Sequence, residues 1–310
     1  MRRRTLYACR LLLFVTVFIL SGQVASQART VGILMTGGIP YYHAIHQTLL
    51  DEMSVYFSEQ NIEVVLQSPL PNPMSWTNAA RKLEALGAEA IVTYGLPATL
   101  ATMKEVGSIP IIFGGVYSPE TLGIGGKNTT GISSTVSMRT VLGRLMDISK
   151  AANIGIIFNK TEKDSIIQAR EVKKFEKQLG FKTFLFNISS GVDAEKIAQC
   201  DALILTSCSA GMCKPQLTES VGLARKNKVP TVALISGAES MVVLTFSAAA
   251  EEQGQQAADM LRKVLQGERP GNIPVRSPEK FDFIINLKEA QAMGIKISAE
   301  ILDSATRILK

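Results

Sequence analysis

The most constraining feature of this sequence is a strand–loop–helix–strand module that occurs twice. In the first copy the apolar stretch Ala90–Gly95 is followed, one helix later, by an apolar stretch that begins at Pro110. In the second copy Ala202–Ser207 is followed, at a similar interval, by a stretch that begins at Pro230. Each module indicates two parallel strands joined by a helix. Two such α/β lobes usually face each other across a cleft, so the repeat predicts a small-molecule site between them.

Apolar strands and amphipathic helices alternate through the rest of the chain, which predicts parallel sheets with helices on both faces. The fold class that we expect is α/β, with two Rossmann-like lobes joined by a multi-strand hinge. The first lobe is predicted to comprise residues 29–135 plus 248–271, with four strands, and the second 136–247 plus 272–310. Within the second lobe we expect one helix over Asp164–Leu179, a strand over Met241–Phe246 and a last helix over Ser298–Leu309.

The first 28 residues are typical of a secretory signal peptide, with an uncleaved anchor as the alternative. Four arginines accompany the apolar run Leu11–Leu20, and small polar residues up to Ala28 offer cleavage sites. These residues carry four basic groups and no acid, so their removal lowers the formal charge from +6 to +2. The basic character therefore gives no support to nucleic-acid binding. We expect an exported protein that is periplasmic or otherwise extracytoplasmic.

Three cysteines follow the signal peptide: Cys200, Cys208 and Cys213. Export permits disulfides, and Cys208 and Cys213 are close enough in sequence to pair. Two buried thiols are the interpretation that we favour, and a local disulfide is the alternative. A metal site is the least expected, because the two histidines, His43 and His46, lie far away in sequence.

In a parallel sheet a ligand lies beyond the carboxyl ends of the strands, so residues that follow each predicted strand form the candidate site. Glycines there let backbone approach a ligand, and polar side chains or free helix N–H groups can bind it. Turns, helix caps and core packing are the alternative roles. For Glu239 we expect contact with a cationic group of the ligand. The predicted ligand-binding residues are Thr36, Gly37, Tyr41, Gly95, Leu96, Pro97, Tyr117, Ser118, Asn159, Ser207, Cys208 and Glu239.

The C-terminal stretch Asn272–Ile295 resembles the end of the ABC transporter substrate-binding protein family that includes tryptophan- and tyrosine-binding members. The segments Ile109–Phe113 and Asn128–Ser133 are also similar to that family, in the same order. The resemblance implies a two-lobed periplasmic-binding fold of type I and delivery of the ligand to a membrane permease. The chain has Ser118 and Cys208 at places where family members often carry an aspartate.

We therefore expect a monomeric, exported solute-binding protein of an ABC importer that captures a small polar ligand, such as an amino acid or a related compound. A periplasmic sensor that docks on a receptor or kinase is the alternative, and an enzyme on the same scaffold is a third. The sequence contains no nucleophile elbow, P-loop or zinc-hydrolase motif. We expect no catalysis, no cofactor and no metal.

Overall fold

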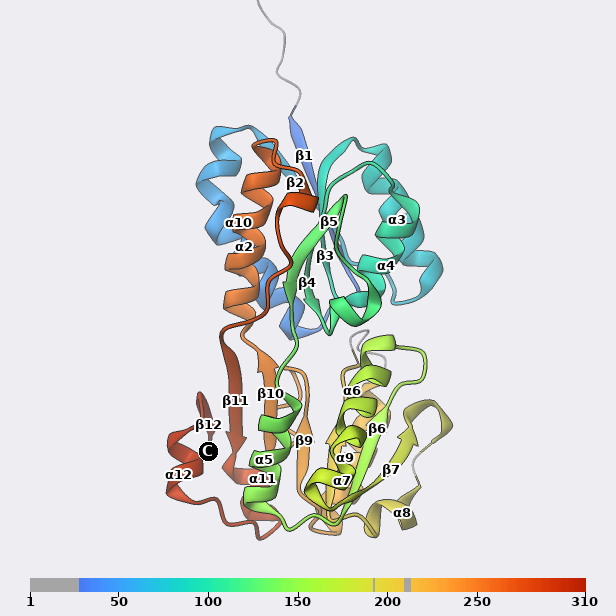
Figure 1. Cartoon of the computed structure of the whole chain (residues 1–310), viewed down its shortest axis with the longest axis vertical. Helices are drawn as coiled ribbons and strands as arrows, with labels where there is room; N and C mark the ends of the chain where they lie inside the picture. Colours follow the sequence, from blue (N-terminus) through green and yellow to red (C-terminus); the bar gives the residue numbers. More distant parts are fainter. Residues whose placement is uncertain (1–27, 192, 209–212) are drawn as a thin grey trace, which may run out of the picture.

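The computed structural model describes residues 28–191, 193–208 and 213–310. The chain forms two α/β lobes stacked along the long axis of the molecule, each built on its own sheet (Figure 1). We call the lobe with the five-stranded sheet the first lobe and the lobe with the seven-stranded sheet the second lobe. The predicted signal peptide, apart from Ala28, lies outside the described residues.

The first lobe holds a parallel sheet with the strand order β2-β1-β3-β4-β5. Four of its five strands, β1 to β4, are the apolar runs that the alternation predicted. Prolines begin α2 and α3 at positions where no intrahelical N–H is needed. The elements are β1 (Arg29–Met35), α2 (Pro40–Glu59), β2 (Ile62–Gln67), α3 (Pro73–Ala85), β3 (Ala88–Tyr94), α4 (Leu96–Glu105), β4 (Ile111–Val116), η1 (Pro119–Leu122), β5 (Thr129–Ser133), α10 (Ala250–Leu265) and η3 (Pro270–Asn272).

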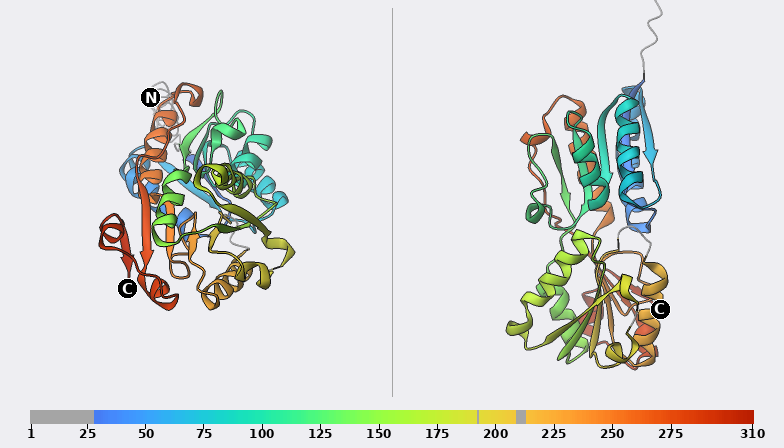
Figure 2. Two further views of the ribbon diagram at one scale, coloured as in Figure 1. Left: turned by 60° about the horizontal axis from the view of Figure 1, so that its bottom comes forward. Right: turned by 90° about the vertical axis from the view of Figure 1, so that its right-hand side faces the viewer.

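Alternate side chains of this sheet face two separate cores. Val31 and Ile33 pack with α2 and α10, whereas Leu34 packs with α3 and α4 on the opposite face. The helices α2 and α10 lie side by side although about two hundred residues separate them along the chain (Figure 1). Helices thus cover both faces of the sheet, and its strand ends face the second lobe (Figure 2).

The second lobe holds a mixed sheet with the order β12-β11-β10-β9-β8-β6-β7, in which the β10–β11 pair is antiparallel. Its elements are α5 (Met138–Ile148), β6 (Asn153–Phe158), α6 (Lys163–Lys174), α7 (Glu176–Leu179), β7 (Lys182–Asn187), η2 (Ile188–Ser190), α8 (Ala194–Ala198), β8 (Ala202–Leu205), α9 (Lys214–Lys226), β9 (Thr231–Ala233), β10 (Leu244–Ala248), β11 (Phe281–Asn286), α11 (Leu287–Ala292), α12 (Ala299–Asp303) and β12 (Arg307–Leu309).

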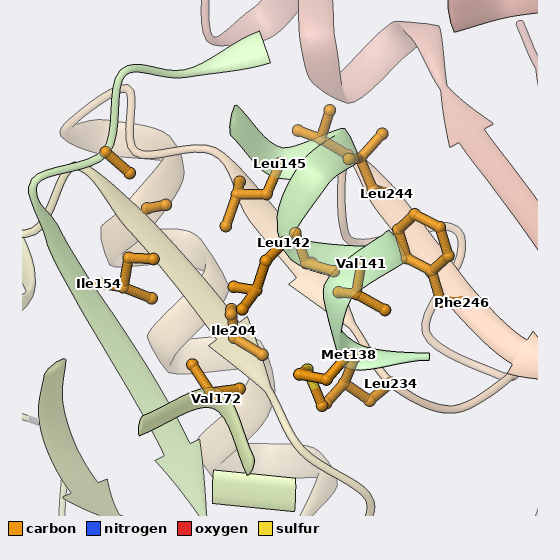
Figure 3. Close-up of a cluster of buried hydrophobic side chains, with 14 of the residues drawn as sticks. Met138, Val141, Leu142, Leu145, Ile154, Val172, Ile204, Leu234, Leu244 and Phe246 are labelled. Atoms are coloured by element: carbon orange, nitrogen blue, oxygen red, sulfur yellow. The ribbon is translucent and has the colours of Figure 1, made fainter. Parts of the chain in front are cut away.

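The larger core of the second lobe lies between α5 and its sheet. Figure 3 shows Val141, Leu142 and Leu145 of α5 directed toward apolar strand residues such as Ile204 and Leu244. All five side chains are fully buried. A second core under α8 and α9 covers the other face of the sheet. The α/β class and the two-lobe arrangement predicted from the sequence are confirmed.

The chain passes between the two sheets after β5, between β10 and α10, and before β11 (Figure 1). Two buried side chains of α10 form hydrogen bonds with backbone groups in or near these connections. The Gln253 amide accepts a hydrogen bond from Gly115 N and donates one to Ser133 O, while the Glu252 carboxylate accepts from Glu279 N and Lys280 N. The residue bounds of the lobes stay a prediction.

Four details of the predicted secondary structure are wrong. The first lobe has a fifth strand, β5, whose short Thr-Thr-Gly run gave little apolar signal. The helix expected over Asp164–Leu179 is interrupted at Phe175, between α6 and α7. The strand expected over Met241–Phe246 instead occupies Leu244–Ala248.

The fourth error concerns the last predicted helix, over Ser298–Leu309. It stops at Asp303, and β12 then pairs in parallel with β11. Because this pairing joins segments that are distant in sequence, the local pattern could not show it.

The interpretation of Cys208 and Cys213 as free thiols is also wrong. The two residues form a disulfide, and both are buried. Cys200 is free and buried, and burial raises the pKa of its thiol to about 11. The disulfide closes the short segment between the end of β8 and the start of α9, next to the face that meets the first lobe.

Candidate functional site

A cavity with an empty volume of about 310 Å³ lies between the lobes, beside the hinge. Both lobes and the hinge segments contribute to its wall, which combines hydroxyl groups, an amide and a carboxyl with a few apolar side chains. The lining residues are Tyr41, Tyr42, Gly115, Tyr117, Ser134, Asp164, Gln168, Ser207, Leu234, Ile235, Ser247 and Ala248.

The acidic group of this cavity is Asp164, in the first turn of α6. An acid is favoured at that position because the amino end of a helix carries partial positive charge, and Asp164 Oδ1 accepts a hydrogen bond from Ser165 N at 3.0 Å. The side chain is only 2% exposed. Burial, together with the neighbouring Glu162 carboxylate, raises the pKa of Asp164 to about 7. A cationic ligand group here would favour the ionised carboxylate.

Gln168 and Ser207 form the polar wall next to Asp164. The Gln168 amide donates to Ser207 Oγ at 2.9 Å and accepts from Ser207 N at 2.7 Å. Gln168 lies four residues after Asp164, so both side chains lie on the same face of α6. The bidentate contact holds the end of β8 against α6 and leaves the Ser207 hydroxyl proton available to an acceptor in the cavity.

Three tyrosines form the wall from the first lobe. Tyr41 is 3% exposed, and among the described residues its phenol oxygen has no hydrogen-bond partner. Burial raises the pKa of Tyr41 far above its ordinary value, so the phenol stays protonated and can donate. The Tyr117 hydroxyl instead donates to Glu171 Oε2 of α6 at 2.5 Å, a hydrogen bond that joins the end of β4 to the second lobe.

A second, more apolar cavity with an empty volume of about 870 Å³ also lies between the lobes. It shares Ile235 with the first cavity, and Ser207 of the first cavity lies between Thr206 and Cys208 of the second. Its lining residues are Gly38, Ile39, Pro40, Leu205, Thr206, Cys208, Lys214, Leu217, Ala233, Ile235, Ser236, Gly237, Ala238 and Met241.

Four of the predicted site residues line one of these two cavities: Tyr41, Tyr117 and Ser207 line the first, and Cys208 lines the second. Ser118 is buried next to Tyr117 and has a left-handed backbone with φ of 48°; its N–H donates to Thr135 Oγ1. Asn159 lines neither cavity, because its amide is engaged by Glu162 and Thr161. A smaller hollow beneath it joins Asn159 to the disulfide.

The strand end after β3 is filled by the protein's own side chains. Thr36 Oγ1 accepts from Ala98 N, in the first turn of α4, at 3.1 Å. A Cβ on Gly95 would lie 2.3 Å from the Tyr42 hydroxyl and 2.7 Å from Thr36 Oγ1. Gly37 and Leu96 are buried and Pro97 is half-buried, and neither cavity includes these five predicted residues: Thr36, Gly37, Gly95, Leu96 and Pro97.

Glu239 also lies outside both cavities. One carboxylate oxygen accepts from Gly237 N at 2.9 Å, and the other lies 3.9 Å from the Arg307 guanidinium. Its backbone carbonyl accepts from Asn286 Nδ2. Glu239 thus links the loop after β9 to β11 and β12, and its carboxylate already has cationic and N–H partners within the chain.

Sequence reasoning missed Asp164 and Gln168. The loop after β6 was recognised, but its first polar residue, Asn159, was selected instead of the acid one turn into the helix. The signal that could have found them is the pair Asp164 and Gln168 on the buried face of an otherwise basic helix. Asp164 is buried and forms no ion pair within the described part of the chain, and such an acid is costly unless it serves a ligand or is protonated.

One group of possible metal ligands occurs among the described residues: Glu162, Cys208 and Cys213. The disulfide occupies both sulfur atoms, so the group offers no thiolates in this state. His46 lies elsewhere, 9% exposed, with Nδ1 at 3.3 Å from the Tyr94 hydroxyl. Burial lowers the pKa of His46, with the His43 side chain adding to the effect.

The profile described as ABC transporter substrate binding protein matches residues 45–309. This chain belongs to that family. It is a solute-binding protein of an ABC transporter, and the family comprises binding proteins, not enzymes. Within the ranges that the structure describes, no helix has both the length and the apolar composition to cross a membrane.

Three similar proteins illustrate the match. The chain is 24% identical over 259 residues to a tyrosine-binding protein of Clostridioides difficile, covering 79% of this chain and 74% of the relative. It is similar, at a TM-score of 0.83 and 18% identity, to an ABC domain in complex with L-Trp from Streptococcus pneumonia, covering 91% of this chain and 100% of the other. It is also similar to the ligand-free, open structure of a substrate-binding protein with adhesive properties from Clostridium difficile, at a TM-score of 0.71 and 21% identity. This match covers 91% of this chain and 99% of the other. These likenesses show the type I periplasmic-binding fold.

Proposed function

We propose that this protein is exported, captures an amino acid between its two lobes and delivers it to a membrane permease. The observation that carries the proposal is a cavity with two polar groups, Asp164 from the second lobe and the Tyr41 phenol from the first. Neither has a complementary charged or hydrogen-bonding side chain among the residues that the structure describes. The similar proteins that bind tyrosine and L-Trp make aromatic amino acids the first ligands to test.

The polar groups of the cavity complement the two charges of an amino acid. Asp164 would accept the ammonium group, and the gain from a charged hydrogen bond offsets the cost of ionising a buried carboxyl. The Tyr41 phenol and the Ser207 hydroxyl would donate to the carboxylate. Tyr41 belongs to the first lobe, whereas Asp164 and Ser207 belong to the second. A zwitterion that binds all three therefore stabilises the arrangement in which the lobes are close together.

The second cavity offers a place for an apolar side chain of the ligand. Its wall contains Ile39 of the first lobe and Leu217 and Met241 of the second, all of them half-buried. An aromatic ring there would remove apolar surface from water, at roughly 25 cal/mol per Å². Because the first cavity is small, a large side chain has to extend past Ile235 into this space.

The proposal can be tested by calorimetric titration of the mature protein with L-tryptophan, L-tyrosine and L-alanine. Indole-3-propionate, which lacks the ammonium group, and tryptamine, which lacks the carboxylate, are the matched controls. We expect an aromatic amino acid to bind, and indole-3-propionate to bind about 100-fold more weakly, because losing a charged partner costs about 3 kcal/mol. Equal affinity for the amino acid and indole-3-propionate would contradict the role of Asp164, and no binding of any amino acid would contradict the proposed function.

Export is a separate part of the proposal, carried by the first 28 residues. When the full chain is produced in a bacterial host, we expect the protein in the extracytoplasmic fraction, with its amino terminus close to Ala28 by mass spectrometry. Retention of Met1 in a membrane fraction would indicate an uncleaved anchor instead.

A further inference from the structure

The solvent face of α6 and α7 carries a stripe of basic side chains. Lys163, Arg170, Lys174 and Lys177 recur at helical spacing and are exposed, and Lys173 lies beside them. None of the ion pairs found within the described ranges involves these cations. We call these five residues the basic face. It lies on the second lobe, on α6 and α7, which Figure 1 shows in front of the sheet.

The segment from Lys163 to Leu179 contains three acids, of which two lie away from the basic face and one, Glu176, lies beside it. Asp164 is buried in the cavity between the lobes, and Glu171 accepts the hydroxyl of Tyr117. Glu176 accepts both Thr183 N, at 2.8 Å, and Thr183 Oγ1 of the edge strand β7. Hydrogen bonds from Thr183, with a smaller contribution from Lys173, lower the pKa of Glu176. Asp164 and Glu171 thus serve internal contacts, Glu176 offsets only part of the charge, and the five cations are exposed.

Exposed apolar side chains adjoin the basic face. Leu179, at the end of α7, is 37% exposed, and Leu185 of β7 is 50% exposed. Side chains alternate along a strand, so Leu185 points to the same side as Thr183, the side that α7 covers. Arg170, Lys173, Lys174, Glu176 and Lys177 surround a shallow hollow. The surface therefore combines dispersed positive charge with two leucines and has no deep, shaped pocket.

We propose that the basic face binds the surface of an anionic phospholipid membrane. Dispersed lysines with neighbouring apolar side chains match a fluid layer of negative headgroups, because each long lysine side chain can reach its own phosphate. An acidic protein partner would be better matched by a pocket or by fixed guanidinium pairs. The contact would keep the second lobe next to the bilayer in which a permease lies, whichever solute the cleft holds.

The geometry separates membrane contact from ligand capture. Asp164 and Gln168 point from α6 into the cavity, whereas the basic face lies on the opposite side of the same helix. Substitutions of the basic face should therefore leave the Kd for a cleft ligand unchanged. This independence also separates failure of the lipid proposal from failure of the proposed transport function.

The test is flotation of the mature, exported protein with vesicles of pure phosphatidylcholine and with vesicles containing phosphatidylglycerol. The K173E/K174E/K177E variant is compared with K226E/K288E/K296E, which changes the net charge equally at exposed lysines of the second lobe outside the basic face. We expect binding to phosphatidylglycerol vesicles only, weakened by salt. The first triple variant should bind at least tenfold more weakly and the control triple less than threefold.

Three results would overturn the inference. They are no binding to phosphatidylglycerol vesicles, an equal loss in the two triple variants, or capture by polyglutamate without capture by vesicles. The L185S variant adds a check on the apolar contribution. It should lower vesicle binding about threefold, because the transfer of the leucine side chain from water into the membrane interface is lost.

Discussion

The strand ends after β3 and after β8 look equivalent in the sequence, yet they differ in the structure. After β3, the Thr36 hydroxyl caps the first turn of α4, and the Tyr42 hydroxyl occupies the space beside Gly95. After β8, Ser207 forms hydrogen bonds with the Gln168 amide and lines the cavity. One strand end is filled by the protein itself, and the other borders the cavity between the lobes.

This difference shows that two copies of one module can differ in whether their strand end borders the cavity between the lobes. The deciding residues, Tyr42 and Gln168, lie outside the modules, on α2 and α6. The first lobe thus contributes tyrosines from the α2 and β4 ends, and the second lobe contributes an acid, an amide and a hydroxyl. The following predictions test this division, from the largest expected effect to the smallest.

The filled strand end should not tolerate a side chain at Gly95. Its backbone has φ of 87° and ψ of 156°, a region that is nearly exclusive to glycine, and a Cβ there would clash with Tyr42. We expect Gly95→Ala to lower the free energy of unfolding by about 4 kcal/mol, combining backbone strain with overpacking. Urea denaturation measures this change.

Gly123→Ala is the matched control for Gly95→Ala. Gly123 also has a positive φ, but nothing lies within 4 Å of an added Cβ. Gly123→Ala should lower the free energy of unfolding by about 1 kcal/mol. An equal effect at the two glycines would show that the β3 end is not tightly filled.

At the open strand end, Asp164→Asn should abolish most of the affinity for an amino acid. Removing the charge that would hold the ammonium group costs about 3 kcal/mol, or roughly 100-fold in Kd by calorimetry. The fold should not be weakened at neutral pH, because the substitution removes a buried carboxyl. Glu171→Gln, on the same helix but outside the cavity, serves as the control, and its affinity for the amino acid should fall less than tenfold.

The raised pKa of Asp164 predicts opposite pH trends for stability and binding. The folded state holds the proton up to about pH 7, whereas the carboxyl has its ordinary value of 3.8 in the unfolded chain. Its contribution to stability is therefore full below about pH 4 and is lost as pH rises through 7. Affinity for an ammonium ligand should instead rise about tenfold between pH 6 and pH 8, because the ionised form binds. Asp164→Asn should flatten both profiles.

The disulfide next to the open strand end should have an intermediate effect. Loss of the Cys208–Cys213 link in a C208S/C213S variant should lower the free energy of unfolding by about 2 kcal/mol, as expected for a short loop. A reductant should reproduce the loss in the wild type and have no further effect on the variant. If the reductant destabilises both proteins equally, its target is not this disulfide.

The smallest expected effect concerns the hydrogen bond between the lobes. Tyr117→Phe removes the donor to Glu171, whose carboxylate is half-buried and can bind water instead. We expect a loss of about 1 kcal/mol of ligand affinity, or roughly fivefold, because the closed arrangement loses one contact. Unchanged affinity would mean that this hydrogen bond forms equally in open and closed states.

The sequence predicted the two-lobed fold because the strands are short apolar runs and their helices carry clear caps or prolines. It did not predict β5 or β12, which depend on pairing with distant strands and lack apolar length. Within the site, strand-end reasoning placed Tyr41, Tyr117 and Ser207, which line the cavity. It also selected Gly95 and Pro97, since no local pattern shows that Thr36 and Tyr42 fill that end.

The most direct test of the account is a crystal structure of the mature protein with L-tryptophan or L-tyrosine, whichever binds more tightly. We predict the ligand between the lobes, with its ammonium nitrogen about 3 Å from the Asp164 carboxylate and its ring in the cavity beyond Ile235. A ligand seated beside Gly95 on the first lobe, with Asp164 facing no cation, would contradict the account.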